Sequence, residues 1–127
     1  MSATDHLTVL GSRVDGALSA EDLEMFDAPP GVDYVEFVTH EVTAFCPVTN
    51  QPDLYTVTIG YHPNAHCVES KSLKLYLMGF RDLGIFGESL AGKIADDLYD
   101  AILPAHLEVE IIQQIRGGLR MTARASR

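Results

Sequence analysis

The sequence has no tryptophan, only two cysteines and no long hydrophobic run. Its apolar runs are a few residues long, whereas a bilayer span needs about 20, so we expect no membrane segment. The first ten residues lack a basic region followed by an apolar stretch, so no secretion signal is visible. We therefore expect a soluble, cytoplasmic protein whose two cysteines stay reduced rather than forming a structural disulfide.

Positive charge is also scarce, because 9 lysines and arginines stand against 18 acidic residues, for a net charge of −9. An acidic protein repels the phosphates of nucleic acid, so direct DNA or RNA binding is not expected. The few basic residues gather in the middle and at the C-terminal end of the chain. Such local cationic patches can bind a small phosphorylated ligand. They consist of Lys71, Lys74, Arg81 and Lys93, and of Arg116, Arg120, Arg124 and Arg127.

The length of 127 residues suits one domain with a single core. Frequent glycines and prolines over residues 1–31 predict an irregular N-terminal arm, and residues 32–127 then form the single domain. Within the arm, residues 19–26 predict one short helix, because Ser19 is a suitable N-cap and acidic residues follow it.

The rest of the chain predicts the order strand, strand, helix, helix, strand, strand. Apolar residues at helical spacing indicate one helix near residues 73–80 and a second that begins at Gly87 or Ser89 and stops before Pro104. We therefore predict an α+β fold, a four-stranded antiparallel sheet with two helices on one face. Its two open edges would suit oligomerisation. The predicted strands are 32–43, 54–61, 107–111 and 119–123, the last two joined by a turn at 116–118.

Residues 45–53, Phe-Cys-Pro-Val-Thr-Asn-Gln-Pro-Asp, form a loop between the first two predicted strands. Cys46 ends one strand and Asp53 opens the next, so a loop that folds back would bring thiol and carboxyl together. Such a pair suits covalent catalysis, in which the thiol attacks an electrophile and the carboxyl handles the proton. From the residues alone, a buried cysteine with Asp53 as a turn residue is the commoner situation.

Residues 69–76, Glu-Ser-Lys-Ser-Leu-Lys-Leu-Tyr, open the first predicted helix. Ser70 or Ser72 can cap it, and Lys71 and Lys74 lie beside its N-terminus. Free backbone N–H groups and lysines together form an anion site. The alternative is an ordinary capped helix with solvated lysines.

Two weaker patterns carry no function. Residues 87–93 match most of a phosphate-binding loop, but no hydrophobic strand precedes them and Ile94 replaces the required serine or threonine. His62, His66, Cys67 and Cys46 fit no strong zinc spacing, so we expect no metal.

Three blocks together resemble the NADPH-dependent 7-cyano-7-deazaguanine reductases, the nitrile reductases of queuosine biosynthesis. They are residues 45–53, residues 68–76 (Val-Glu-Ser-Lys-Ser-Leu-Lys-Leu-Tyr) and residues 116–118 (Arg-Gly-Gly), in the family's order and spacing. The resemblance runs from about Leu7 to Gly118. It implies the tunnelling fold that GTP cyclohydrolase I shares, assembled into a homo-oligomeric ring, with two rings able to stack and substrate sites between subunits.

The resemblance also implies a mechanism. Cys46 would add to the nitrile carbon of the deazaguanine and give a thioimide, while Asp53 protonates the nitrogen. Two hydrides from NADPH would then give 7-aminomethyl-7-deazaguanine, a precursor in tRNA modification. Cofactor phosphates would bind to Lys71, Lys74 and Arg116, and the substrate to Glu88, Phe86, Glu69 and Ser70.

One departure from the family concerns residue 87. The family usually has Phe-His-Glu where this chain has Phe86, Gly87 and Glu88, and the histidine assists proton transfer during reduction. His62 or His66 could replace it. The alternatives are non-reductive thioimide chemistry, as in the archaeal amidinotransferases of this fold, action on a related deazapurine nitrile, and a non-catalytic base-binding or ring-forming scaffold.

Overall fold

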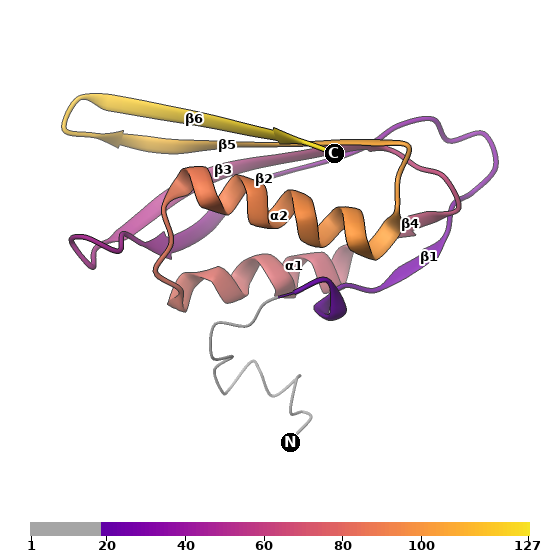
Figure 1. Ribbon diagram of the computed structural model, residues 1–127, viewed down its shortest axis with the longest axis horizontal. Helices are drawn as coiled ribbons and strands as arrows, with labels where there is room; N and C mark the ends of the chain where they lie inside the picture. Colours follow the sequence, from indigo (N-terminus) through magenta and orange to yellow (C-terminus); the bar gives the residue numbers. More distant parts are fainter. Residues whose placement is uncertain (1–18) are drawn as a thin grey trace, which may run out of the picture.

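A four-stranded antiparallel sheet is the frame of the computed structural model, which describes residues 19–127 (Figure 1). Its strand order β2-β3-β5-β6 confirms the predicted pair of hairpins and leaves β2 and β6 as open edges. Glycines with positive φ at residues 117 and 118 make the second hairpin turn. The strands are β2 (Val35–Phe45), β3 (Pro52–His62), β5 (His106–Arg116) and β6 (Leu119–Ser126).

Both predicted helices are present, and they lie on one face of the sheet (Figure 1). Helix α1 (Ser70–Met78) continues into the 3-10 helix η3 (Gly79–Asp82), and α2 (Gly87–Ile102) follows. Helix α2 ends at Leu103, which adopts a left-handed conformation (φ 46°) just before Pro104. Among residues 19–127, no helix is long and apolar enough to cross a membrane.

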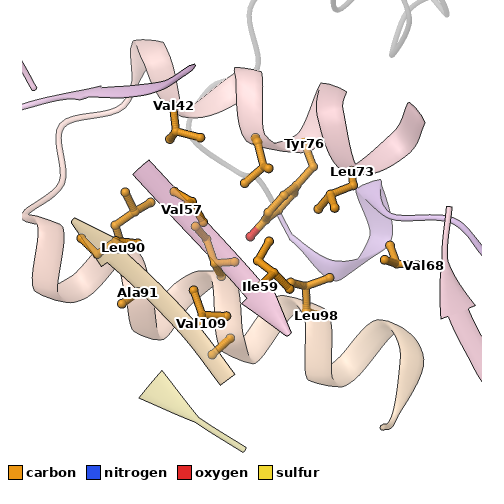
Figure 2. Packing of buried hydrophobic residues seen from close by; sticks show 14 of the residues in the cluster. Val42, Val57, Ile59, Val68, Leu73, Tyr76, Leu90, Ala91, Leu98 and Val109 are labelled. Atoms are coloured by element: carbon orange, nitrogen blue, oxygen red, sulfur yellow. The ribbon is translucent and has the colours of Figure 1, made fainter. Parts of the chain in front are cut away.

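The core lies between the sheet and the two helices, because alternate side chains of β3 and β5 point toward the helices. Figure 2 shows Val57 and Ile59 of β3 among Leu90, Leu98 and Tyr76 of the helices. Burying each such side chain contributes about 1.5–3 kcal/mol, which makes this layer the main source of stability. Asp53 and Tyr55 occupy the same alternating face at the start of β3, so the core pattern continues to the end of the strand that meets the Cys46 loop.

The helix predicted over residues 19–26 is shorter than expected. One 3-10 turn, η2 (Ala20–Asp22), is capped by Ser19 as predicted, and strand β1 (Met25–Asp27) follows it. Strand β1 pairs with β4 (His66–Val68) in a two-stranded sheet that the sequence pattern did not predict. Three-residue strands are too short to show alternation, and these two lie about 40 residues apart in the chain.

The predicted arm over 1–31 is described only from Ser19 onward, where Leu23 is buried in the core. Residues 1–18 lie outside the described residues. The division of the chain at residue 31 stays a prediction.

Candidate active site

The loop from Cys46 to Asp53 folds back on itself, as predicted. The last pair of the β2–β3 ladder joins Phe45 to Pro52, so Cys46 and Asp53 both adjoin that pair. Two backbone hydrogen bonds close the loop, from Cys46 N to Gln51 O (2.9 Å) and from Asn50 N to Cys46 O (2.8 Å). The hairpin therefore holds the thiol-bearing and carboxyl-bearing residues at one end of the sheet.

The thiol of Cys46 is half-buried and lies in an environment that favours its charged form. A hydrogen bond from the Thr49 side chain lowers the pKa of Cys46 most. The backbone N–H groups of Thr49 and Val48 and the positive charge of Arg116 lower it further. Because the thiolate is the reactive form of cysteine, this setting suits a nucleophile.

Asp53 is buried, with 5% of its surface exposed, and it forms an ion pair with Arg116. Arg116 also donates a hydrogen bond to Gln51 Oε1 at 2.6 Å, so one guanidinium holds both the carboxylate and the loop. Within one chain, Arg116 lies apart from Lys71 and Lys74, so their predicted grouping around the cofactor stays a prediction that needs a second subunit. Arg116 lies at the β5–β6 hairpin, whereas α1 begins at the opposite end of the sheet, beside β4 (Figure 1).

The segment that leads into α2 is hydrogen-bonded to Phe45, the residue that precedes Cys46. Phe45 N donates to Leu83 O and Ile85 N donates to Phe45 O, both at 2.9 Å, in a parallel bridge between Phe45 and Gly84. Phe86, 50% exposed, and Glu88, also exposed, follow at the N-terminus of the helix. An exposed aromatic ring and a carboxylate therefore lie on the segment next to the Cys46 loop, and together they suit the binding of a flat heterocycle that has N–H donors.

Gly87 is buried at the first position of α2. A Cβ atom there would overlap the Met121 side chain and would lie 3.1 Å from both Ile111 Cδ1 and Tyr55 Cε1. The space that a side chain at position 87 would need is therefore filled by neighbouring side chains.

Glu69, rather than the predicted Ser70 or Ser72, caps α1. Its carboxylate accepts hydrogen bonds from Lys71 N (2.9 Å) and Ser72 N (2.7 Å), which lower the pKa of Glu69. Ser72 instead accepts a hydrogen bond from Glu24 N, at 2.9 Å. The N–H groups expected to bind an anion are thus partly occupied, and an anion here would depend on the exposed side chains of Lys71 and Lys74.

The two histidines considered as substitutes for a side chain at position 87 lie far from Cys46. His62 ends β3 and lies nine residues from Asp53, a distance of roughly 30 Å along a strand. Its Nδ1 lies 2.9 Å from Asp33 O. His66 is in β4, opposite Asp27. Within one chain, an extended strand therefore separates both histidines from Cys46, and their part in proton transfer stays a prediction that needs a second subunit.

The partial phosphate-loop match lies inside α2, where Lys93 pairs with Asp97 at 3.1 Å, so it forms no loop. In the described part of the chain, no group of three or more His, Cys, Asp or Glu side chains is placed to hold a metal ion.

The sequence reading missed two features of this site. The Arg116–Asp53 ion pair joins residues 63 positions apart, and only the β3–β5 register brings them together. Tyr55 was not singled out because it falls on the apolar side of a predicted strand, yet its buried hydroxyl has no hydrogen-bond partner. The signal in the sequence is a polar hydroxyl on the apolar side of a strand, two residues after Asp53.

Comparison with known proteins yields one family. The family model described as "QueF-like protein" matches residues 52–127. Three relatives, each named NADPH-dependent 7-cyano-7-deazaguanine reductase, cover most of the chain. The one from Chloroherpeton thalassium is 43% identical over 86% of this chain and 96% of its own length. The relative from Chlorobaculum tepidum is 40% identical over 86% and 95%. The relative from Anaeromyxobacter sp. is 44% identical over 84% and 88%.

A solved structure, that of the archaeosine synthase QueF-Like in the apo form, has the same fold. It superposes with a TM-score of 0.71, covers 76% of this chain and 94% of its own, and is 20% identical. At this identity the likeness concerns the fold alone, and it confirms the predicted tunnelling fold.

Proposed function

The chain belongs to the QueF-like protein family, and from that premise we propose that it reduces the nitrile of 7-cyano-7-deazaguanine to an aminomethyl group with NADPH, in queuosine biosynthesis. The names of relatives that share 40–44% of their residues with most of this chain support the reaction. The observation that carries the proposal is the half-buried Cys46, with its lowered pKa, at one end of a hairpin loop whose other end leads into the buried Asp53.

In the proposed first step, the sulfur of Cys46 adds to the nitrile carbon and one C–N π bond breaks. Asp53 passes the proton that the thiol loses to the nitrile nitrogen, which gives a neutral thioimide. Arg116 keeps the Asp53 carboxylate in place for this transfer. The two residues adjoin the same strand pair, so the step needs no large rearrangement of the chain.

Substrate recognition is assigned to the start of α2 and to the cap of α1. Glu88 would accept hydrogen bonds from the guanine-like edge, and Phe86 would stack on the ring. Glu69 and Ser70, at the start of α1, would contribute from a neighbouring subunit. Each oxygen of Glu69 already accepts one backbone N–H and keeps a further lone pair for a ligand.

Lys71 and Lys74 are the groups that fit the cofactor. Both are exposed in the first turns of α1, and ammonium groups suit the phosphates of NADPH, including the 2′-phosphate. When bound, NADPH supplies the hydrides. Because these lysines and Cys46 lie at opposite ends of the sheet, we propose that each complete site forms between two subunits of a ring, with lysines from one and the nucleophile from the next.

The main experiment incubates the protein with 7-cyano-7-deazaguanine and NADPH and follows NADPH absorbance, intact mass and product. We expect NADPH oxidation with formation of the amine. A Cys46 adduct without NADPH oxidation would support non-reductive thioimide chemistry instead. Absence of both adduct and product would overturn enzymatic function and favour a base-binding scaffold.

Subunit complementation tests the shared site. Neither Cys46→Ala nor the double variant Lys71→Ala, Lys74→Ala should reduce the nitrile alone, but the lysine variant should still form the adduct. A mixture that has been unfolded and refolded together should regain about a quarter of wild-type activity if two random subunits complete each site. No recovery in the mixture would place each site within one chain. The control Arg127→Ala removes a cation that pairs with Asp96 and should not change NADPH binding.

A further inference from the structure

The hydroxyl of Tyr55 is a buried polar group without a partner. Only 1% of Tyr55 is exposed, and among residues 19–127 its Oη and His66 Nδ1 are the buried side-chain polar atoms with no hydrogen bond. His66 has the Asp27 carboxylate 3.9 Å away, which leaves Tyr55 as the less satisfied group. Proteins rarely bury a hydroxyl unpaired, and each case calls for an explanation.

Tyr55 lies at the candidate active site rather than in the middle of the core. It follows Asp53 by two residues on the same face of β3, and its Cε1 lies 3.1 Å from the point where a Cβ of residue 87 would be. Burial raises the pKa of Tyr55 most, and the negative charges of Glu88 and Cys46 raise it further. The phenol thus lies within electrostatic reach of the proposed nucleophile and of the proposed base-binding carboxylate.

Reduction of a nitrile to an amine places two protons on the same nitrogen. Asp53 passes on the first during thioimide formation, and a second donor is then needed. Gly87 has no side chain, and within one chain His62 and His66 lie at the far end of β3, so only a neighbouring subunit could bring them to Cys46. The phenol of Tyr55 occupies the volume beside Gly87 and has a free O–H.

We propose that Tyr55 is a catalytic acid that donates the second proton to the substrate nitrogen during reduction, an inference that rests on the function proposed above. As the thioimide carbon accepts a hydride, the C=N π pair moves to nitrogen, which takes the proton from Tyr55 Oη. The nitrogen lone pair then expels the Cys46 thiolate and leaves an iminium ion, whose carbon accepts the second hydride to give the amine. Water returns a proton to the phenolate, so two hydrides and two protons are consumed in all.

The surroundings of Tyr55 suit this role. A phenol whose pKa is raised above its usual value stays protonated at neutral pH, and so remains a donor when the charges of Glu88 and Cys46 are close. The nitrogen that forms during hydride addition is a far stronger base than phenolate, so the transfer is favourable. Met121 and Ile111 pack around the position-87 space that the ring borders, which keeps the ring in place.

The test compares Tyr55→Phe with a matched control, Tyr61→Phe. Tyr61 lies on the same face of the same strand and is equally buried, but its hydroxyl accepts a hydrogen bond from Val68 N at 3.1 Å. For Tyr55→Phe we expect normal adduct formation, reduction slowed by about 100-fold or more, and a Tm equal to or above that of the wild type. For Tyr61→Phe we expect a lower Tm and reduction at the wild-type rate.

Single-turnover measurements isolate the step. The adduct is formed first, NADPH is then added, and decay of the adduct is followed by mass. If wild type and Tyr55→Phe reduce the adduct equally fast, the role of Tyr55 is refuted while the proposed function stands. If Tyr55→Phe slows capture as much as reduction and lowers the Tm, the hydroxyl is structural. If wild type itself captures but never reduces, the proposed function and this inference fall together.

Discussion

Each end of β3 places a tyrosine of the strand near a cysteine of another segment, but the surroundings of the two pairs differ. At the C-terminal end, Tyr61 accepts a hydrogen bond from Val68 N, and its neighbour Cys67 is buried, with 3% of its surface exposed. At the N-terminal end, Tyr55 is as deeply buried but unpaired, and Cys46 lies half-buried on a loop. Burial alone therefore does not distinguish the two tyrosines.

The difference lies in what surrounds each tyrosine. The pKa of Tyr61 is raised to about 12, mainly by burial; the hydrogen bond from Val68 N opposes this rise and interactions with Cys67 add to it. Around Tyr55 the additional influences are the charges of Glu88 and Cys46, two residues of the candidate active site. The hydroxyl of Tyr61 is satisfied within the fold, whereas the hydroxyl of Tyr55 has no partner. Four predictions test this comparison.

The largest effect is expected from removing the two thiols separately. Cys46→Ala should abolish the covalent adduct with 7-cyano-7-deazaguanine, because the attacking sulfur is gone. Cys67→Ala should retain it, because that side chain is enclosed in the core. Intact mass after incubation with the nitrile measures both. An adduct that still forms on Cys46→Ala would mean that Cys46 is not the attacking residue.

Tyr61→Phe should destabilise the protein by about 1–3 kcal/mol, because it leaves the buried Val68 N–H without its acceptor. Denaturant unfolding measures this loss. Tyr55→Phe is the comparison and should cost nothing, since its hydroxyl has no partner to lose. If both variants lose the same free energy of unfolding, the two tyrosine hydroxyls do not differ in how the fold satisfies them.

Gly87→Ala should destabilise by about 1 kcal/mol, at the low end of overpacking costs. The flexible end of Met121 can rotate away, but Tyr55 and Ile111 must yield by a few tenths of an ångström. Gly92→Ala, in the same helix with only Arg127 4.0 Å from its new Cβ, should instead stabilise by up to about 1 kcal/mol. A stabilised Gly87→Ala would mean that the site end is loosely packed. Gly87→His should be worse than Gly87→Ala, so restoring a histidine should not raise activity.

The smallest effect concerns the acidity of the thiol. Thr49→Val removes the hydrogen bond that lowers the pKa of Cys46 most, so this pKa should rise. The thiolate fraction at neutral pH then falls, and the midpoint of the pH–rate curve for alkylation by iodoacetamide should move to higher pH. Thr122→Val, at an exposed position on β6, is the control. If the midpoint does not move, the backbone N–H groups of Thr49 and Val48 and the charge of Arg116 lower the pKa of Cys46, and the Thr49 side chain does not.

The sequence predicted the sheet and helices because their side chains repeat with clear periods over five or more residues. It missed the β1–β4 pair, whose three-residue strands carry no period. It placed Cys46 and Asp53 correctly at one loop, because two strands flanking a short loop must pair.

Contacts between distant parts of the chain were beyond the sequence. The pairing of Arg116 with Asp53 depends on the register of a third strand, and the cap of α1 depends on which side chain reaches the first N–H groups. Ser72 lies inside α1, where its hydroxyl donates a hydrogen bond to Glu69 O and accepts one from Glu24 N, 48 residues away.

The bridge between Phe45 and Gly84 has a consequence for how the chain can vary. Two hydrogen bonds, through Leu83 and Ile85, fix the start of α2 against the residue that precedes Cys46. These hydrogen bonds, rather than the length of the connection after α1, thus set the separation between Cys46 and Glu88. Insertions or deletions before Leu83 should leave that separation unchanged, whereas one added residue between Ile85 and Glu88 would turn the carboxylate away.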